Sequence, residues 1–207
     1  MGTKIISIII ILMVAITSID STCKKEILGC ANSVYSFQTG MSVYPDQEAM
    51  HVGDTLWIEM NIPTSQTDMS SGKIIDYSNA ANFGANVGMS EIINKYSFLS
   101  AANFFDYKLV LGRSLQSPNI VQLRSFLFIE QNAKYLFKLG IVPKQKGVFG
   151  LGVSNATNVY RNSDYCTKAS FLINIENSNQ HYYLNPALNS SNFDTTKTSA
   201  SYYFKVK

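Results

Sequence analysis

Apolar and polar side chains alternate with a period of two along much of this chain beyond residue 30. The clearest run extends over residues 54–62, where every second residue from Leu56 on is apolar: Leu56, Ile58, Met60 and Ile62. Glu59 and Asn61 fall on the opposite face of the run, together with Trp57. Because successive side chains of a strand point to opposite faces, the pattern predicts a strand with one buried face.

Further runs of the same kind predict the remaining strands. They cover residues 34–43, 120–128, 133–142, 147–153, 170–175 and 202–206, with weaker candidates at 73–77 and 106–111. A short polar loop with proline at one end and glycine at the other separates 133–142 from 147–153, which predicts a hairpin. Eight to ten short strands with turns between them are typical of a two-layer antiparallel sandwich, so we predict an all-β fold.

The stretch 64–118 contains few clean strands, and we expect it to form an elaborated, irregular edge or end of the sandwich. Residues 90–98 within it fit two turns of a helix capped by Ser90, or a strand carried on a loop. We expect Trp57, on the polar side of its strand, to be buried beneath this segment. No internal repeat or linker divides residues 33–207, which we interpret as a single domain.

The first 22 residues have the pattern of an export signal peptide. Lys4 precedes an apolar run of 12 residues, from Ile5 to Ile16, that a single serine interrupts. Such a run matches the core of a signal peptide and is too short to span a bilayer core about 30 Å thick. It stops shortly before Cys23, as in bacterial lipoproteins, where this cysteine is acylated and residues 23–32 would form a lipidated tether. An ordinary secretory signal cut near residues 21–22 and an uncleaved anchor are the alternatives.

The number of cysteines is odd, so in an exported protein one cysteine is expected to stay outside the intramolecular disulfides, as a free or modified thiol. The three are Cys23, Cys30 and Cys166. If Cys23 carries a lipid, Cys30 and Cys166 can form a disulfide in an oxidising compartment and close a span of 136 residues (166 − 30). A Cys23–Cys30 bridge would close a trivial loop and leave Cys166 unpaired. A zinc site is disfavoured, because no Cys and His residues cluster at ligand spacing.

Several short segments resemble a known group of proteins. They are Cys23-Lys24-Lys25-Glu26, residues 29–35 (GCANSVY), residues 52–57 (VGDTLW), residues 164–166 (DYC) and residues 202–206 (YYFKV). Together they resemble small uncharacterised lipoproteins of Bacteroidota. The resemblance implies an outer-membrane lipoprotein, facing the periplasm or the surface, with no assigned activity. The Val-Gly-Asp-Thr entry into an alternating strand also resembles immunoglobulin-like bacterial modules, which implies an immunoglobulin-like sandwich.

Composition excludes two broad classes of protein. Aromatic residues make up 12% of the chain and charged residues only 15%, so the chain is not mainly disordered. The formal net charge is +3, from 17 basic and 14 acidic residues, and no basic run is longer than Lys24-Lys25. We therefore expect no nucleic-acid partner.

Catalytic chemistry has little support in the sequence. Neither histidine, His51 nor His181, accompanies a recognisable nucleophile motif, and we interpret both as solvated loop residues. Asp46, Glu48 and Asp54 could serve a glycosidase or bind calcium, but turn formers and a solvated edge are the simpler interpretation. We expect no catalytic residue, no metal site and no cofactor.

Aromatic residues are numerous for a chain of this length, with 12 Tyr, 12 Phe and one Trp. Five tyrosines are predicted in loops or at strand ends: Tyr77, Tyr160, Tyr165, Tyr182 and Tyr183. Aromatic rings beside amides are typical of sugar- or peptide-binding surfaces, whereas tyrosines with solvated hydroxyls at the sandwich ends are the plainer interpretation. We expect a non-enzymatic, lipid-anchored envelope protein that binds a glycan or a protein. An envelope or polysaccharide hydrolase, an accessory subunit of an outer-membrane complex, and a secreted location are the alternatives.

Overall fold

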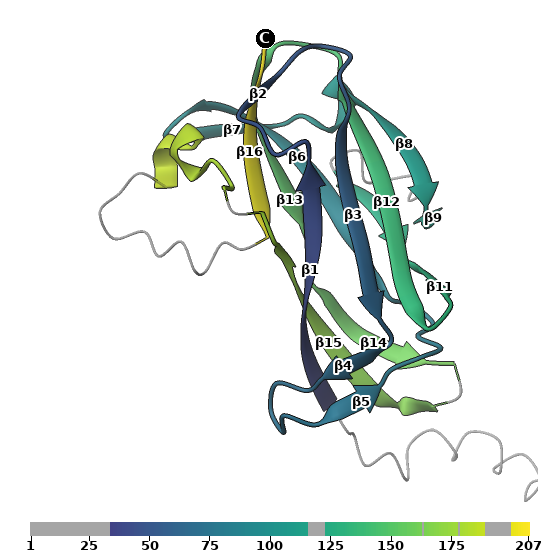
Figure 1. Ribbon diagram of the computed structural model, residues 1–207. Helices are drawn as coiled ribbons and strands as arrows, with labels where there is room; N and C mark the ends of the chain where they lie inside the picture. The colour runs from purple at the N-terminus through teal and green to yellow at the C-terminus, as the bar shows by residue number, and fades with distance from the viewer. Residues whose placement is uncertain (1–33, 116–122, 163, 178, 189–199) are drawn as a thin grey trace, which may run out of the picture. The chain divides into compact units, whose positions relative to one another are not determined.

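Two β-sheets make up most of the structure (Figure 1). The computed structural model describes residues 34–115, 123–162, 164–177, 179–188 and 200–207. Residues Val34–Lys207 form one compact unit, and nearly all of its regular structure is strand. The prediction of an all-β sandwich is confirmed, while the immunoglobulin-like resemblance stays a prediction.

The first sheet contains seven of the described strands. They are β1 (Val34–Tyr44), β3 (Leu56–Pro63), β8 (Phe105–Leu111), β11 (Ile129–Gln131), β12 (Lys134–Pro143), β14 (Ala156–Arg161) and β15 (Asp164–Ile175). Their order across the sheet is β11-β12-β3-β1-β15-β14, with β8 also beside β12. In Figure 1, β1, β3 and β12 run side by side through this sheet.

The second sheet contains another seven. They are β2 (Ala49–Met50), β6 (Gly84–Asn94), β7 (Ser97–Ser100), β9 (Arg113–Leu115), β10 (Leu123–Leu127), β13 (Gly147–Val153) and β16 (Ser201–Val206). Their order is β2-β16-β13-β6-β10-β9, with β7 also beside β6. A small separate sheet pairs β4 (Ser65–Thr67) with β5 (Ile74–Asp76), and three short 3₁₀ helices are η1 (Ala102–Phe104), η2 (Tyr182–Leu184) and η3 (Pro186–Leu188).

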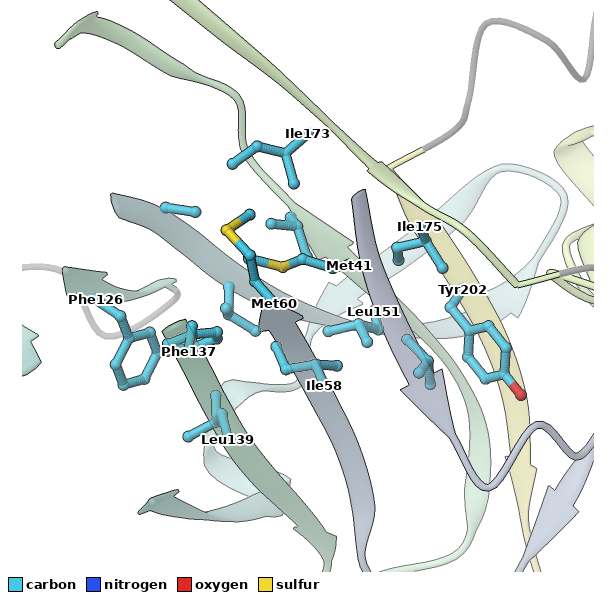
Figure 2. Close-up of a cluster of buried hydrophobic side chains, with 14 of the residues drawn as sticks. Met41, Ile58, Met60, Phe126, Phe137, Leu139, Leu151, Ile173, Ile175 and Tyr202 are labelled. Carbon is cyan, nitrogen blue, oxygen red and sulfur yellow. The ribbon is translucent and has the colours of Figure 1, made fainter. Parts of the chain in front are cut away.

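Aromatic side chains join the two sheets in the core. Phe83, just before β6, stacks on Phe171 of β15 with 4.0 Å between ring centroids. Phe126 of β10 meets Phe137 of β12 at 5.4 Å. Figure 2 shows aliphatic side chains from both sheets packed beside Phe126 and Phe137. Burial of this apolar surface is the main favourable contribution to the stability of such a fold.

β1 changes partner along its length. Residues 34–41 pair in parallel with residues 168–175 of β15, and residues 42–44 pair antiparallel with residues 57–59 of β3. β2 also pairs in parallel with β16. The prediction of a purely antiparallel sandwich is therefore wrong in these two places. Parallel neighbours require a long connection, and the β1–β15 pair uses most of the chain for it.

The predicted hairpin between residues 133–142 and 147–153 is also wrong. β12 lies in the first sheet between β3 and β8, whereas β13 lies in the second sheet between β6 and β16. Residues 144–146 thus carry the chain from one sheet to the other. A short polar loop suits both arrangements, because apolar alternation marks the buried face of a strand without identifying its neighbour.

β3 has the predicted register, with one face almost fully buried: Leu56, Ile58 and Met60. Asn61 on the other face is exposed, and Trp57 is half-buried there. We predicted cover from residues 64–118, and β12, which lies outside that segment, supplies contacts to the ring. The indole lies against Gly140, and the Lys138 ammonium stands 5.3 Å from the ring centroid. The missing side chain at Gly140 makes room for the ring.

The described part of the segment 64–118 is mostly extended, so the expectation of an irregular segment is wrong there. It contributes β4, β5, β6, β7, β8 and β9 and the short η1. Residues 90–98, which fit either a helix or a strand, form the end of β6 and the start of β7. These two strands pair antiparallel, so the region is a hairpin.

Asp68 ties the start of β1 to the turn between β4 and β5. Its buried carboxylate accepts hydrogen bonds from the Ser36 amide (3.0 Å), the Ser70 hydroxyl (2.6 Å) and the Ser71 amide (2.9 Å). These bonds, the one from Ser36 first, hold the pKa of Asp68 well below the ordinary range of a carboxyl group. The charged form is therefore satisfied despite its burial.

Candidate binding groove

Small residues face outward from the two central strands of the second sheet. Buried apolar residues of β6 and β13 point into the core: Val87, Met89, Phe149 and Leu151. The alternate positions point outward and carry little side chain: Asn86, Gly88, Ser90, Gly150 and Gly152. Gly88 and Gly152 are direct partners across the two strands. The outer surface of the sheet is hollow at Gly152, where an added Cβ would meet nothing within 4 Å, while the Leu123 side chain lies against Gly88.

A groove of about 470 Å³ lies over these glycines. Its lining comes from five strands and their ends: Asn86, Gly88, Met89, Ser90, Ser100, Leu123, Gly150, Leu151, Gly152, Val153, Ser154, Ala200, Ser201 and Tyr203. A second depression of about 240 Å³ adjoins it, lined by parts of β6, β9, β10 and β14, and shares Asn86 and Ser154 with it. The two depressions meet at these two residues and together form a path from the outer face of the second sheet to β14 of the first sheet.

Hydrogen bonds fix the side chains where the two depressions meet. The Ser125 hydroxyl donates to Asn86 Oδ1 (2.6 Å), and the Asn86 backbone amide donates to Ser154 Oγ (2.9 Å). The Ser154 amide donates in turn to the Asn86 carbonyl (2.9 Å). Among the described residues the Nδ2 group of Asn86 has no hydrogen-bond partner, so a ligand in the groove can accept from it.

The described lining of the groove is uncharged. None of the described residues that line the two depressions is Asp, Glu, Lys, Arg or His. Its polar side chains are the hydroxyls and amides of serine, threonine, tyrosine and asparagine, which both donate and accept hydrogen bonds. The described lining can therefore hold a neutral polar ligand through hydrogen bonds.

Tyr203 forms one side of the groove. Its ring covers its cross-strand partner Gly150, where an added Cβ would lie 2.9 Å from the ring. The ring belongs to a second apolar cluster with Ile92 and Leu184. The Asn185 Nδ2 group donates to the Tyr203 hydroxyl (3.2 Å). Packing and hydrogen bonding thus hold this aromatic wall in place.

The prediction that His181 is a solvated loop residue is wrong. Its side chain is buried, and its Nδ1 lies 3.0 Å from the carbonyl oxygen of Tyr203. The imidazole also meets the Tyr202 ring at 5.3 Å in an edge-on contact. These contacts pack His181 against β16. His51, by contrast, is exposed as predicted.

The five tyrosines predicted to form a binding surface fall into separate parts of the fold. Tyr77 is fully buried, and its hydroxyl donates to the Val159 carbonyl (2.7 Å), so its assignment to a surface is wrong. Tyr160 lies on β14 at the edge of the first sheet, whereas Tyr182 and Tyr183 lie in η2 beside β16. The remaining one, Tyr165, belongs to β15, and its side chain lies outside the described part of the structure.

The three carboxylates considered for catalysis or calcium binding have partners of their own. Glu48 accepts hydrogen bonds from the Lys205 ammonium (2.6 Å) and the Tyr183 hydroxyl (2.6 Å). The Lys205 bond, followed by that from Tyr183, lowers the pKa of Glu48. Asp46 accepts a hydrogen bond from the Tyr202 hydroxyl, and Asp54 accepts one from the backbone amide of His51. In the described ranges, no three His, Cys, Asp or Glu side chains gather as a metal site would require.

The predictions made for the N-terminal cysteines fall largely outside the described residues. Cys23 and Cys30 both precede Val34, where the described residues begin, whereas Cys166 lies in β15. Lipidation and the Cys30–Cys166 pairing therefore stay predictions. From residue 34 on, the described helices include none that is long and apolar enough to cross a membrane.

Comparison with known proteins returns no match to this chain. This holds for protein-family models, for curated proteins and for solved structures. The geometry and chemistry of the groove are therefore what indicate a function.

Proposed function

We propose that this protein is a non-enzymatic, lipid-anchored module of the bacterial cell envelope that binds a neutral glycan. The observation that carries the binding role is the groove on the outer face of the second sheet, whose described lining is uncharged and includes three glycines. The aromatic surface expected from the sequence is not needed for this proposal. Tyr203 and the small residues of β6 and β13 take its place.

The chemistry of the groove suits a sugar chain. Sugars present hydroxyl groups that both donate and accept hydrogen bonds, and Ser90, Ser100 and Ser201 offer the same versatility. The Asn86 amide adds a donor at the junction of the two depressions. Glycine at position 152 lets a ligand approach the backbone closely. A path of two joined depressions favours an extended chain over a single small molecule.

The absence of charge from the described lining selects the class of glycan. An acidic polysaccharide would place carboxylates or sulfates against a surface with no cation to pair with them. Desolvating those groups would be unfavourable without such a partner. A neutral polymer meets no such penalty, so neutral glycans are the preferred ligand.

The envelope location rests on the sequence. An apolar run of signal length ends shortly before Cys23, and we infer that this cysteine is acylated. We also infer a Cys30–Cys166 disulfide. In its support, the sequence offers only two other cysteines as partners for Cys166. With Cys23 acylated, Cys30 is the one that remains.

Gly152→Phe tests the groove directly. An added Cβ at Gly152 meets no atom within 4 Å, so a phenyl ring there enters the groove without displacing the backbone. We expect affinity for a bound neutral polysaccharide to fall about tenfold or more, a loss of about 1.4 kcal/mol. Affinity electrophoresis of the full chain in detergent, against soluble starch, dextran, galactomannan and mixed-linkage β-glucan, measures the change.

Leu172→Phe is the matched control, because Leu172 is exposed on β15 in the other sheet and gains the same aromatic bulk. It should migrate as the wild-type protein does. Unchanged retardation of Gly152→Phe would remove the groove from the proposal. Failure of all four polysaccharides to retard the wild-type chain would refute neutral-glycan binding.

Cys23→Ser tests the anchor separately. Serine has no thiol to acylate, so we expect the variant to move from the membrane fraction to the soluble fraction after a salt wash. Immunoblotting of the two fractions measures the distribution, and Cys30→Ser serves as a control that should stay with the membranes. A Cys23→Ser protein that still sediments with membranes would contradict lipidation without touching the groove.

A further inference from the structure

A second cleft lies at an open edge of the sandwich, where the chain passes from one sheet to the other. β8 is an edge strand of the first sheet, and β9 begins at the edge of the second sheet two residues after β8 ends. Figure 1 shows β8 and β9 together at one side of the fold. The cleft has a volume of about 480 Å³, and its polar lining residues are Asn103, Asp106, Tyr107, Ser114, Arg124 and Lys144.

This cleft is distinct from the groove. Leu123 and Ser125 of β10 line the path on the outer face of the second sheet. Arg124 lies between them in the strand and therefore points to the opposite face, into the cleft. The two sites differ in charge as well, because the groove is neutral over its described lining and the cleft carries charged residues.

The Tyr107 hydroxyl is the unusual group in the cleft. Its oxygen is buried and makes no hydrogen bond of ordinary geometry among the described residues, and the Arg124 guanidinium is near enough to oppose the rise in its pKa. Burial raises the pKa of Tyr107 to about 12, so the hydroxyl is protonated at neutral pH and can donate a hydrogen bond. Buried hydroxyls in folded proteins are nearly always paired. A ligand oxygen that accepts a hydrogen bond from the Tyr107 hydroxyl would remove the free-energy cost of leaving this buried group without a hydrogen bond.

Arg124 supplies a positive charge beside that hydroxyl. Its guanidinium carbon lies 5.3 Å from the centroid of the Tyr107 ring, which orients the planar group over the ring. No described carboxylate forms an ion pair with Arg124, whereas Lys144 pairs with Asp106 at 3.3 Å. Among the described residues, two cations and one anion line the cleft, a net charge of +1 (2 − 1).

We propose that this cleft binds a carboxylate-bearing ligand, with Arg124 as its ionic partner and Tyr107 as a hydrogen-bond donor. A guanidinium presents paired N–H groups that match the two oxygens of a carboxylate. The net charge of +1 complements a monoanion better than a doubly charged phosphate. The volume lies within the range of about 300–1,000 Å³ that small-molecule sites occupy.

Isothermal titration calorimetry of the full chain in detergent at low ionic strength tests the proposal with sodium glucuronate as the probe. Glucose is the neutral counterpart, and inorganic phosphate is the doubly charged one. We expect glucuronate to bind, phosphate to bind more weakly and glucose not to bind. Arg124→Gln should weaken glucuronate binding by about 10- to 100-fold, the usual value of a hydrogen bond to a charged group.

Two further variants separate the proposal from a merely structural role. Tyr107→Phe removes only the unpaired hydroxyl and should weaken binding by about 2- to 10-fold without lowering the unfolding temperature. Asp106→Asn removes the anion from the lining and should strengthen binding. Lys108→Gln removes an exposed cation of β8 that does not line the cleft, and it should leave binding unchanged.

Three results would overturn the proposal. The first is a chain that does not bind glucuronate. The second is an equal loss of affinity in Arg124→Gln and Lys108→Gln, which would indicate non-specific attraction to a basic protein. The third is tighter binding of phosphate than of glucuronate, which would replace the carboxylate with a different anion. Each of these results leaves the neutral groove on the other face of β10 unaffected.

Discussion

Phe171→Ala is expected to lower the free energy of unfolding by about 3–5 kcal/mol, the usual range for removing a buried phenylalanine. Phe171 is fully buried in β15, where it stacks on Phe83 at 4.0 Å and meets Phe37 at 5.0 Å. β15 pairs with β1 on one side and β14 on the other. Because neighbours on both sides hold the backbone in place, the cavity left by the ring cannot collapse.

Leu172→Ala provides the matched control one residue away. Leu172 points to the opposite face of β15 and is 38% exposed, so its loss should change stability by only about 0.5 kcal/mol. Urea denaturation of both variants, followed by tryptophan fluorescence, gives the two midpoints. Equal shifts of the two midpoints would show that the inward face of β15 is assigned incorrectly.

Gly84→Ala is expected to destabilise the fold by about 1–3 kcal/mol through overpacking. An ideal Cβ on Gly84 would lie 2.0 Å from the backbone oxygen of Phe126 and 2.9 Å from the Cα of Leu127. Gly84 pairs with Leu127 where β6 meets β10. Since the clashing atoms belong to the backbone, the two strands must separate locally to admit a methyl group.

Gly152→Ala is the control for this change, since it adds the same methyl group to the neighbouring strand β13. A Cβ there meets nothing within 4 Å. Alanine is less costly than glycine in a strand by roughly 0.5–1 kcal/mol, so Gly152→Ala should be neutral or slightly stabilising. Thermal unfolding followed by circular dichroism compares the two variants. A Gly84→Ala protein as stable as Gly152→Ala would contradict the close approach of β6 and β10.

The sequence predicts individual strands better than it predicts their neighbours. β3 is recognisable because its alternation is local: each apolar residue from Leu56 to Met60 reports its own burial. The hairpin predicted across residues 143–147 is wrong because the same alternation suits a strand in either sheet. The parallel pairing of β1 with β15 joins segments too far apart in the chain for any local pattern to indicate it.

The groove escaped prediction for a related reason. Gly150-x-Gly152-x-Ser154 and Asn86-x-Gly88-x-Ser90 both place small residues at every second position, and that signal is visible in the sequence. Its meaning depends on β6 and β13 being neighbours, which sets Gly88 beside Gly152. Residues 90–98 also fitted a helix capped by Ser90, so the strand at this position was not predicted unambiguously. The tyrosines predicted to form a binding surface are buried, like Tyr77, or lie in separate parts of the fold.

The parallel pairing of β1 with β15 also constrains the order in which the chain can fold. Val34 pairs with Lys168, 134 residues later (168 − 34). Contacts between such distant residues form slowly. Closing the long intervening loop costs conformational entropy before the contacts contribute any favourable free energy. A chain that emerges from its N-terminus first exposes β1 long before its main partner exists. The N-terminal part of β1 is therefore synthesised long before it can be fixed in place by its parallel partner.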